Sequence, residues 1–155
     1  MVSVYSLDSS ALVKRYVDES GSAWIQTLTE PKARHKLIIA RITWVEILSA
    51  FARRQREGTF APADAAKALQ SFRFDLDHQY QVVEIDRTLI ESAGQLVGKH
   101  PSRAYDAVQL ASVLWILPAF AQAKTVSLTF LSADDRLVAA AQAEGLNTEH
   151  PNQHS

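Results

Sequence analysis

The feature of this sequence that most constrains its fold is a repeated alternation of short β-like runs with longer helical patterns. The β-like runs fall at residues 2–7, 37–40, 81–85 and 127–131. Apolar residues at helical spacing occupy residues 9–17, 22–28, 44–57, 62–77, 86–97, 104–117 and 133–144. Strands that alternate with helices of this length predict an α/β fold with a mainly parallel sheet and helices on both faces.

The length and composition suit one soluble domain. The chain has 155 residues, of which 47% are hydrophobic, enough to bury a core without cross-links. Residues 1–146 are expected to form the domain, whereas the polar residues 147–155 are expected to fray. The sequence has 0 cysteines, which excludes disulfides and thiolate metal sites. No secretory signal and no run of about 20 apolar residues is found, so a cytoplasmic location without membrane contact is expected.

The charge balance is nearly neutral. Sixteen basic and seventeen acidic residues give a formal net charge of −1. Proteins that coat nucleic acid are usually strongly basic, so this balance argues against that class. An enzyme that holds a few phosphates through a metal ion and a local basic patch remains compatible with it.

Four acidic residues occupy positions where such folds place their ligands. In open parallel sheets the ligand site lies beyond the carboxyl ends of the strands. Asp8 and Asp134 come directly after predicted strands, Glu46 lies in the helix after the second strand, and Asp106 lies one turn into an apolar helix. Carboxylate oxygens are the preferred ligands of hard cations, so this set predicts a Mg²⁺ or Mn²⁺ site.

Three of these acids also have a purely structural interpretation. Asp8 would cap the helix that follows it, and Asp134 would lie in a first helical turn, where the helix dipole favours acids. Glu46 would complete a capping box with Thr43. Both interpretations stay open for each of the three residues.

Asp106 is harder to explain as a structural residue. Its predicted helix is apolar nearly all round, with one narrow polar line formed by Arg103, Asp106, Gln109 and Ser112. A carboxylate on a buried helix is costly unless it is paired or bound to a metal ion. Arg103 is the available structural partner, but we favour a functional role for Asp106.

The same residues lie in segments that resemble a known family. The segments are residues 8–16 (DSSALVKRY), 44–47 (WVEI), 105–111 (YDAVQLA) and 131–134 (LSAD). In this order they resemble the PIN-domain ribonucleases, in particular the VapC toxins of bacterial toxin–antitoxin pairs, over residues 2–145. The resemblance implies a PIN-like three-layer α/β/α fold with a short, mainly parallel sheet. It also implies Mg²⁺- or Mn²⁺-dependent endonucleolytic cleavage of RNA.

The resemblance further implies roles for individual residues and partners. Asp8, Asp106 and Asp134 match the metal-site aspartates, Glu46 matches the glutamate, and Ser132 matches a supporting Ser or Thr. The implied partners are an RNA substrate, a small antitoxin protein and a second copy of the chain in a homodimer.

Basic side chains near the candidate site are expected to contact the substrate. These are Lys14, Arg15 and Arg103. Residues 53–56 (RRQR) have two interpretations, phosphate contacts or a solvated helix face, and the solvated face is favoured. The apolar segment around Trp115 is interpreted as core or as a dimer contact.

A non-catalytic α/β module, such as a phospho-receiver domain, is the main alternative. Receiver domains usually carry adjacent acids after the first strand and a lysine after a late strand. Here Ser9 and Ser10 follow Asp8, and no lysine follows Leu131. The nuclease is therefore the favoured hypothesis, with DNA left open as a second substrate.

Overall fold

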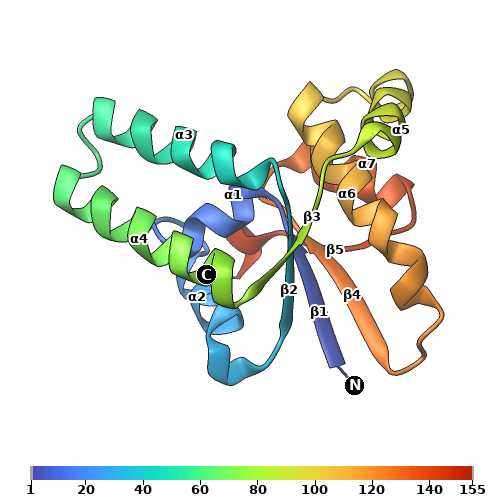
Figure 1. The fold of residues 1–155 in the computed structure, drawn as a ribbon, viewed down its shortest axis with the longest axis horizontal. Coiled ribbons are helices and arrows are strands. Elements are labelled where there is room, and N and C mark those ends of the chain that lie inside the picture. The colour runs from blue at the N-terminus through green and yellow to red at the C-terminus, as the bar shows by residue number, and fades with distance from the viewer. Residues whose placement is uncertain (1, 155) are drawn as a thin grey trace.

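The computed structural model describes residues 2–154, and within them five strands form one all-parallel sheet (Figure 1). The sheet order is β3-β2-β1-β4-β5. The strands are β1 (Val2–Leu7), β2 (Lys36–Ala40), β3 (Tyr80–Val83), β4 (Val126–Leu131) and β5 (Asn147–Glu149). The predicted parallel sheet is confirmed, and it contains one strand more than predicted.

Helices cover both faces of this sheet, which confirms the three-layer α/β/α architecture (Figure 1). One face carries α1 (Ser9–Leu12), α2 (Ser22–Thr29), α3 (Thr43–Arg56) and α4 (Pro62–His78). The other face carries α5 (Arg87–Lys99), α6 (Ala104–Ala121) and α7 (Asp135–Ala143).

The two cores follow from the alternation of side chains along the central strands. In β2, Leu37 and Ile39 pack beneath α1–α4, whereas Ile38 packs beneath α5–α7. A strand buried on both faces needs a continuous apolar run, which explains why residues 37–40 lack polar side chains. The largest fully buried side chains, Phe72 and Phe130, lie one in each core.

The first predicted helix, residues 9–17, is shorter than expected. The α-helix ends at Leu12 and the chain tightens into the 3-10 turn η1 (Val13–Arg15). The side chains after this point are engaged elsewhere in the fold: the Arg15 guanidinium donates to the Tyr80 hydroxyl at 2.7 Å, and the Tyr16 hydroxyl donates to Asp75 at 2.7 Å. These contacts with distant parts of the chain override the local helical pattern.

The prediction that residues 147–155 fray is wrong for the described part of that segment. Residues 147–149 form β5, which extends the sheet beside β4, and residues 151–153 form the 3-10 turn η3. Pro151 is buried, and the His154 ring stacks on Trp24 with centroids 3.9 Å apart. The exposed edge of β4 offers backbone groups that the polar tail can pair with, and composition alone does not reveal this edge.

Helix α6 is four residues longer than predicted and continues past Pro118 to Ala121. Among residues 2–154 it is the one helix whose length and composition would suit a bilayer. Its residues 107–113 are buried against the sheet, as in the core helix of a globular fold. Its second half is partly exposed, and Trp115 is 59% exposed, so Trp115 is not a core residue.

Candidate active site

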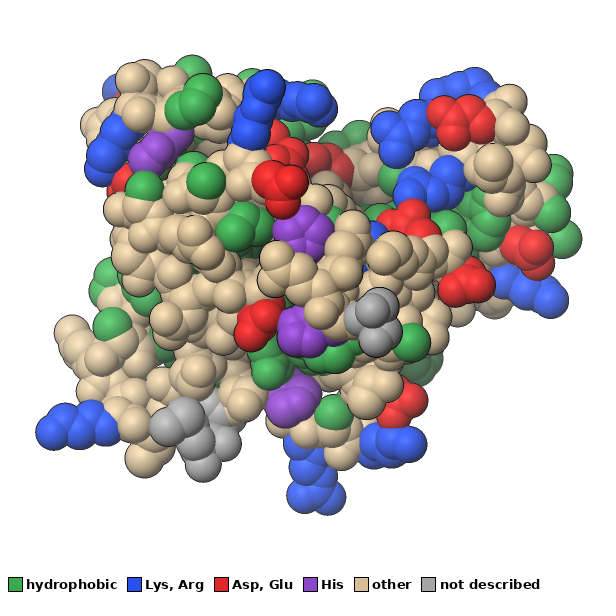
Figure 2. All heavy atoms as spheres, turned by 180° about the vertical axis from the view of Figure 1, so that it is seen from behind, with side chains coloured by type: hydrophobic (Ala, Val, Ile, Leu, Met, Phe, Trp, Pro, Cys, Tyr) green, Lys and Arg blue, Asp and Glu red, His purple; other side chains and the backbone are tan. Residues whose placement is uncertain are grey.

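A cavity opens where the strand order changes direction. From β1 the chain runs outward through β2 and β3, then returns to add β4 on the other side of β1. The loops after β1 and β4 therefore diverge and leave a crevice, as expected at a switch point in a parallel sheet. Seen from behind, the molecule is hollowed between two lobes, with acidic side chains at the hollow and Lys and Arg side chains on both sides (Figure 2).

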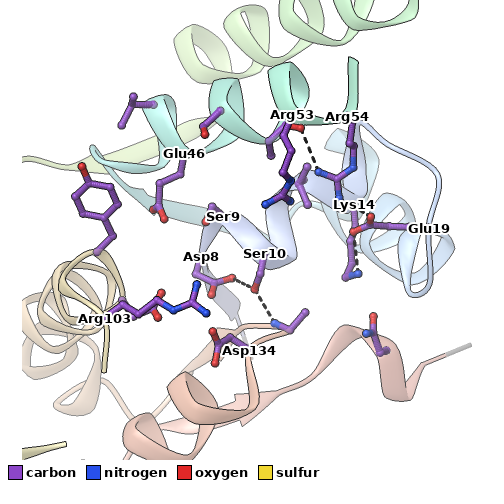
Figure 3. A pocket seen from close by; sticks show the side chains of 18 residues that line it. Asp8, Ser9, Ser10, Lys14, Glu19, Glu46, Arg53, Arg54, Arg103 and Asp134 are labelled. Atoms are coloured by element: carbon purple, nitrogen blue, oxygen red, sulfur yellow. Dashed lines mark hydrogen bonds and ion pairs between the residues drawn. The ribbon is translucent and has the colours of Figure 1, made fainter. Parts of the chain in front are cut away.

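This cavity has a volume of about 670 Å³ and is lined by all four predicted acids. Asp8 comes from the end of β1, Glu46 from α3, Asp106 from α6 and Asp134 from the start of α7. Asp8 and Asp134 are 126 residues apart in the sequence, so it is the fold that brings them to the same cavity. Figure 3 shows Asp8, Glu46 and Asp134 around one space.

Asp8 is both a helix cap and a buried member of the site. Its Oδ1 accepts from the Ala11 backbone N–H at 2.9 Å and from the Ser10 hydroxyl at 2.7 Å. Its Oδ2 accepts from the Ser132 hydroxyl at 2.6 Å, which leaves a lone pair of that oxygen free. The residue is 3% exposed, and this burial raises the pKa of its carboxyl to about 6, despite the hydrogen bonds that lower it.

Two serines tie the loops after β1 and β4 together behind Asp8. The Ser10 hydroxyl accepts from the Ala133 backbone N–H at 2.8 Å, and the buried Ser132 hydroxyl accepts from the Asp134 N–H at 3.1 Å. Ser132 was predicted to support the site, whereas Ser10 was not. The signal for Ser10 is its place two residues after Asp8, where a short side chain can bond to the cap.

Glu46 does not form the capping box predicted for it. The residue before α3 is Ile42, so Thr43 lies inside the helix and cannot act as its cap. Instead, Glu46 Oε1 accepts from the side-chain amide of Gln109 at 2.7 Å, and the same amide donates to the Thr43 hydroxyl at 2.9 Å. Burial raises the pKa of Glu46, and the charges of Asp8 and Asp106 raise it further.

Gln109 therefore holds Glu46 toward the cavity from the opposite face of the site. It is 3% exposed and links α6 to α3. The sequence placed Gln109 on the polar line of its helix but indicated no partner for it. A buried amide on an apolar helix is the signal that identifies it, because such a group requires a hydrogen-bond partner.

Asp134 is the N-cap of α7 rather than a residue of its first turn, and it caps the helix through one oxygen only. Its Oδ1 accepts from the backbone N–H groups of Arg136 at 2.9 Å and Leu137 at 3.1 Å. Its Oδ2 has no hydrogen-bond donor among residues 2–154. A cap can thus also present an oxygen to the cavity.

Asp106 lies half-buried in the first turn of α6. Within the described chain its carboxylate makes no hydrogen bond or ion pair, so the structural partner considered for it, Arg103, does not form a salt bridge. Burial raises the pKa of Asp106, the charge of Asp134 raises it further, and Arg103 lowers it. Arg103 itself lines the cavity and points toward Asp8 (Figure 3).

The basic residues are distributed differently from the sequence-based expectation. Lys14 and Arg103 line the cavity, but Arg15 does not, because its guanidinium bonds to Gln79 and Tyr80 on the far side of η1. The interpretation of residues 53–56 as a solvated face holds for Arg53, which is exposed, but not for Arg54, whose side chain is 17% exposed and paired with Glu19. Arg53 and Arg54 line the same cavity as the acids.

The donor set fits a hard divalent cation. It offers carboxylate and hydroxyl oxygens only. Burial raises the pKa values of Asp8, Glu46 and Asp106, and the charges of neighbouring acids raise them further, so the ionised forms are disfavoured. A cation placed among them would remove this cost. In residues 2–154, no three His, Asp or Glu side chains form a ready-made metal cluster, so the carboxylates would have to draw together around an ion.

The strand order and the helices on both faces define a three-layer α/β/α protein with an all-parallel sheet. No protein-family profile and no curated protein sequence matches it. Solved structures do match. PAE2754 from Pyrobaculum aerophilum is 20% identical with a TM-score of 0.62, over 93% of this chain and 82% of that one.

Two further matches are VapC structures. VapBC2 from Rickettsia felis, bound to a DNA fragment from their promoter, is 12% identical with a TM-score of 0.58, over 95% of this chain and 98% of that one. VapC20 from Mycobacterium tuberculosis, a sarcin–ricin loop-cleaving toxin, is 15% identical with a TM-score of 0.58, over 88% of this chain and 94% of that one. The fold of this chain is thus the PIN-like fold of VapC toxins.

Proposed function

We propose that this protein is a Mg²⁺- or Mn²⁺-dependent endoribonuclease that acts as the toxin of a toxin–antitoxin pair. The observation that carries the proposal is that Asp8, Glu46, Asp106 and Asp134, from four separate elements, line one cavity at the switch point of a VapC-like fold. Four carboxyl groups in one cavity are costly for a fold without a bound cation, which argues against a purely structural role.

In this proposal the four acids hold the metal ion through oxygens that their hydrogen bonds leave free. Asp8 and Asp134 each retain an Oδ2 lone pair beside their capping bonds, and Gln109 orients Glu46. When bound, the ion would lower the pKa of a water molecule and stabilise charge on a phosphoryl oxygen. Ser10 and Ser132 fix the Asp8 carboxylate, while Arg103 positions the phosphate beside the acids and Lys14 adds positive charge at the other end of the cavity.

The proposed partners follow from the same fold. A toxin–antitoxin complex from Klebsiella pneumoniae also matches this chain, at 16% identity with a TM-score of 0.57 over 95% of this chain and 97% of that one, so we propose a small antitoxin protein as the partner of this chain, and the cytoplasm as its location. RNA is the proposed substrate because the resemblance to PIN-domain ribonucleases implies it, and VapC20, a sarcin–ricin loop-cleaving toxin, has a similar fold. A homodimer is proposed through the exposed apolar side chains of α5 and α6, which include Trp115 and Val97.

Cleavage of structured RNAs by the purified protein with Mg²⁺ or Mn²⁺ tests this function. Asp106→Asn is expected to abolish cleavage and to leave the melting temperature within a few degrees of wild type, because Asp106 makes no hydrogen bond within the described residues. EDTA should abolish cleavage as well. Asp64→Asn is the matched control, since Asp64 is also a first-turn acid, in α4, but lies outside the cavity.

Retained cleavage in Asp106→Asn would contradict the assignment of the site. If the wild-type protein cleaved neither RNA nor DNA and bound no metal ion, the non-catalytic α/β module would replace the nuclease. Stoichiometric labelling of one aspartate by acetyl phosphate would then identify a receiver domain.

A further inference from the structure

The cavity has a second, basic end that the four acids do not explain. Lys14, Arg53 and Arg54 line it together with Glu19, at the side formed by η1 and the second half of α3 (Figure 3). Five carboxyl and four cationic side chains line the whole cavity, yet three of the four cations gather at this end. The charges of the cavity are therefore separated along its length rather than mixed.

Helix α3 sets the distance between the two ends. Glu46 and Arg53 are seven residues apart, which is two turns, so both project from the same face of the helix. At 1.5 Å per residue, their backbones are separated by about 10 Å along the helix axis. Ser49 lies between them and also lines the cavity. One wall thus leads from the carboxylates to the cations without a break.

Glu19 fixes two of the three cations in place. Lys14 Nζ lies 3.0 Å from Glu19 Oε1, and Arg54 Nη2 lies 2.7 Å from Glu19 Oε2. The side chains of Lys14 and Arg54 are 5% and 17% exposed, and the two cations hold the pKa of Glu19 below its usual range against the effect of burial. Two cations share one anion, so this buried group keeps a net positive charge.

Arg53 is the cation left available for a ligand. Its side chain reaches from α3 toward Ser10, over the cavity (Figure 3). Within residues 2–154 its guanidinium makes no hydrogen bond or ion pair, because Glu19 is paired with Lys14 and Arg54 instead. An exposed guanidinium beside a fixed positive group is suited to bind a phosphodiester through two hydrogen bonds.

We infer that this basic end is a phosphate-binding subsite for the nucleic-acid strand, one step along the backbone from the phosphate at the four acids. Arg53 contacts the phosphodiester directly, while the Lys14–Glu19–Arg54 group supplies fixed positive charge behind it. The nucleic-acid strand then lies along α3 and runs from the acidic end of the cavity to its basic end. This inference rests on the proposed nuclease function, because it places the scissile phosphate at the acids.

Binding of an unstructured, fluorescently labelled single-stranded RNA tests the subsite without requiring catalysis. Anisotropy is measured in EDTA over a series of salt concentrations, so that the strand stays intact. Arg53→Gln is expected to weaken binding several-fold at low salt and to reduce the slope of log K against log salt by about 0.7, the value for one phosphate contact on a single strand. Its melting temperature should be unchanged, since Arg53 has no partner to lose.

Arg56→Gln is the matched control, because Arg56 is an exposed arginine of the same helix that does not line the cavity. It should bind RNA with the affinity and salt slope of the wild type. Equal binding by Arg53→Gln and Arg56→Gln would overturn the subsite, as would a wild-type protein that binds no single strand at any salt concentration.

Cleavage assays on the same variants separate this inference from the proposed function. Metal-dependent cleavage with no effect of Arg53→Gln on binding would leave the nuclease standing and remove the subsite. An Arg53-dependent affinity in a protein that never cleaves would leave the basic end as a nucleic-acid contact and remove the nuclease.

Discussion

Asp8 stabilises the start of α1 as a cap, but its ionised carboxylate is disfavoured by burial. The carboxylate caps α1 and accepts three hydrogen bonds, yet burial holds its pKa at about 6, above the ordinary value of 3.8. A residue kept only as a cap would gain stability from its charge. A buried carboxylate whose charge is disfavoured is instead typical of a functional site.

The pH dependence of stability follows from this shift. Because the pKa of Asp8 is higher in the folded protein than in the unfolded chain, its contribution to the free energy of unfolding is full below about pH 4 and is lost as the pH rises through about 6. Asn cannot ionise, so Asp8→Asn removes the loss of stability that the ionised Asp8 carboxylate causes above about pH 6. Its side-chain oxygen still accepts a hydrogen bond from the Ala11 N–H. The variant is expected to be more stable than wild type at about pH 8 in EDTA, by roughly 2–3 kcal/mol.

Urea denaturation of both proteins at several pH values in EDTA measures this difference. The stability gap should close between about pH 6 and pH 4, where wild-type Asp8 becomes protonated. If Asp8→Asn were less stable at every pH, the residue would act as a cap and no more.

At the residue scale, the sequence predicted the four acids and Ser132 as candidates, and the fold places all five at one cavity or directly behind it. It did not predict Gln109 or Ser10, because their partners Glu46 and Ala133 are distant in the sequence, and it favoured a solvated face for Arg53, whose place at the cavity depends on the fold. Arg15 was wrongly included for the same reason: its neighbours in the sequence face the cavity, but its own side chain turns toward Tyr80.

At the scale of elements, α3 and α6 form the site jointly through one buried amide. Gln109 of α6 donates to Thr43 and Glu46 of α3, and the three side chains form a bridge across the crevice. Thr43 is fully buried, so its hydroxyl depends on this bond. The bridge holds the acid-bearing first turn of α3 against the sheet.

Gln109→Leu is expected to keep the volume of the side chain but remove both bonds. Leaving the Thr43 hydroxyl and the Glu46 carboxylate without their donor should lower the free energy of unfolding by about 1–3 kcal/mol. Release of Glu46 should reduce metal-dependent cleavage by about 10- to 100-fold, the usual effect of losing a group that orients a metal ligand. Gln95→Leu, at an exposed position on α5, is the control and should change neither quantity. Undiminished cleavage in a folded Gln109→Leu protein would show that Glu46 needs no support.

Element boundaries were predicted well where a local signal sets them. Asp86 caps α5 through the Leu89 N–H at 2.8 Å, Pro62 opens α4, and Gly145 with φ 89° follows α7. The early end of α1 could not be predicted, because it depends on hydrogen bonds between η1 and the distant β3 and α4.

At the scale of the whole molecule, the last residues described hold the edge of the site together. β5 pairs with β4, and η3 packs Pro151 over Gly21 and brings Asn152 to the cavity wall. Composition does not indicate this arrangement, since a short polar segment with a proline is typical of a frayed end. The available edge of β4 and the space above Gly21 exist only in the folded protein.

Two glycines test this packing as a matched pair. Gly21 and Gly58 both have positive φ, 84° and 76°, so alanine is strained at either position. A Cβ at Gly21 would lie 2.7 Å from the Pro151 carbonyl oxygen, whereas a Cβ at Gly58 would meet nothing within 4 Å. Gly21→Ala is therefore expected to be less stable than Gly58→Ala by about 1–3 kcal/mol, the cost of overpacking. Equal losses in thermal or urea unfolding would mean that η3 is not seated on Gly21.

Calorimetric titration of the purified protein with Mn²⁺ near pH 8 measures whether the four acids bind a metal ion. Saturable binding is expected for the wild type and for Asp64→Asn, and none for Asp106→Asn, because only the last of these loses an acid from the cavity. Affinity should fall as the pH is lowered through about 6, where Asp8 takes up a proton. Equal binding by all three proteins, or binding by none, would contradict a metal site built from these four acids.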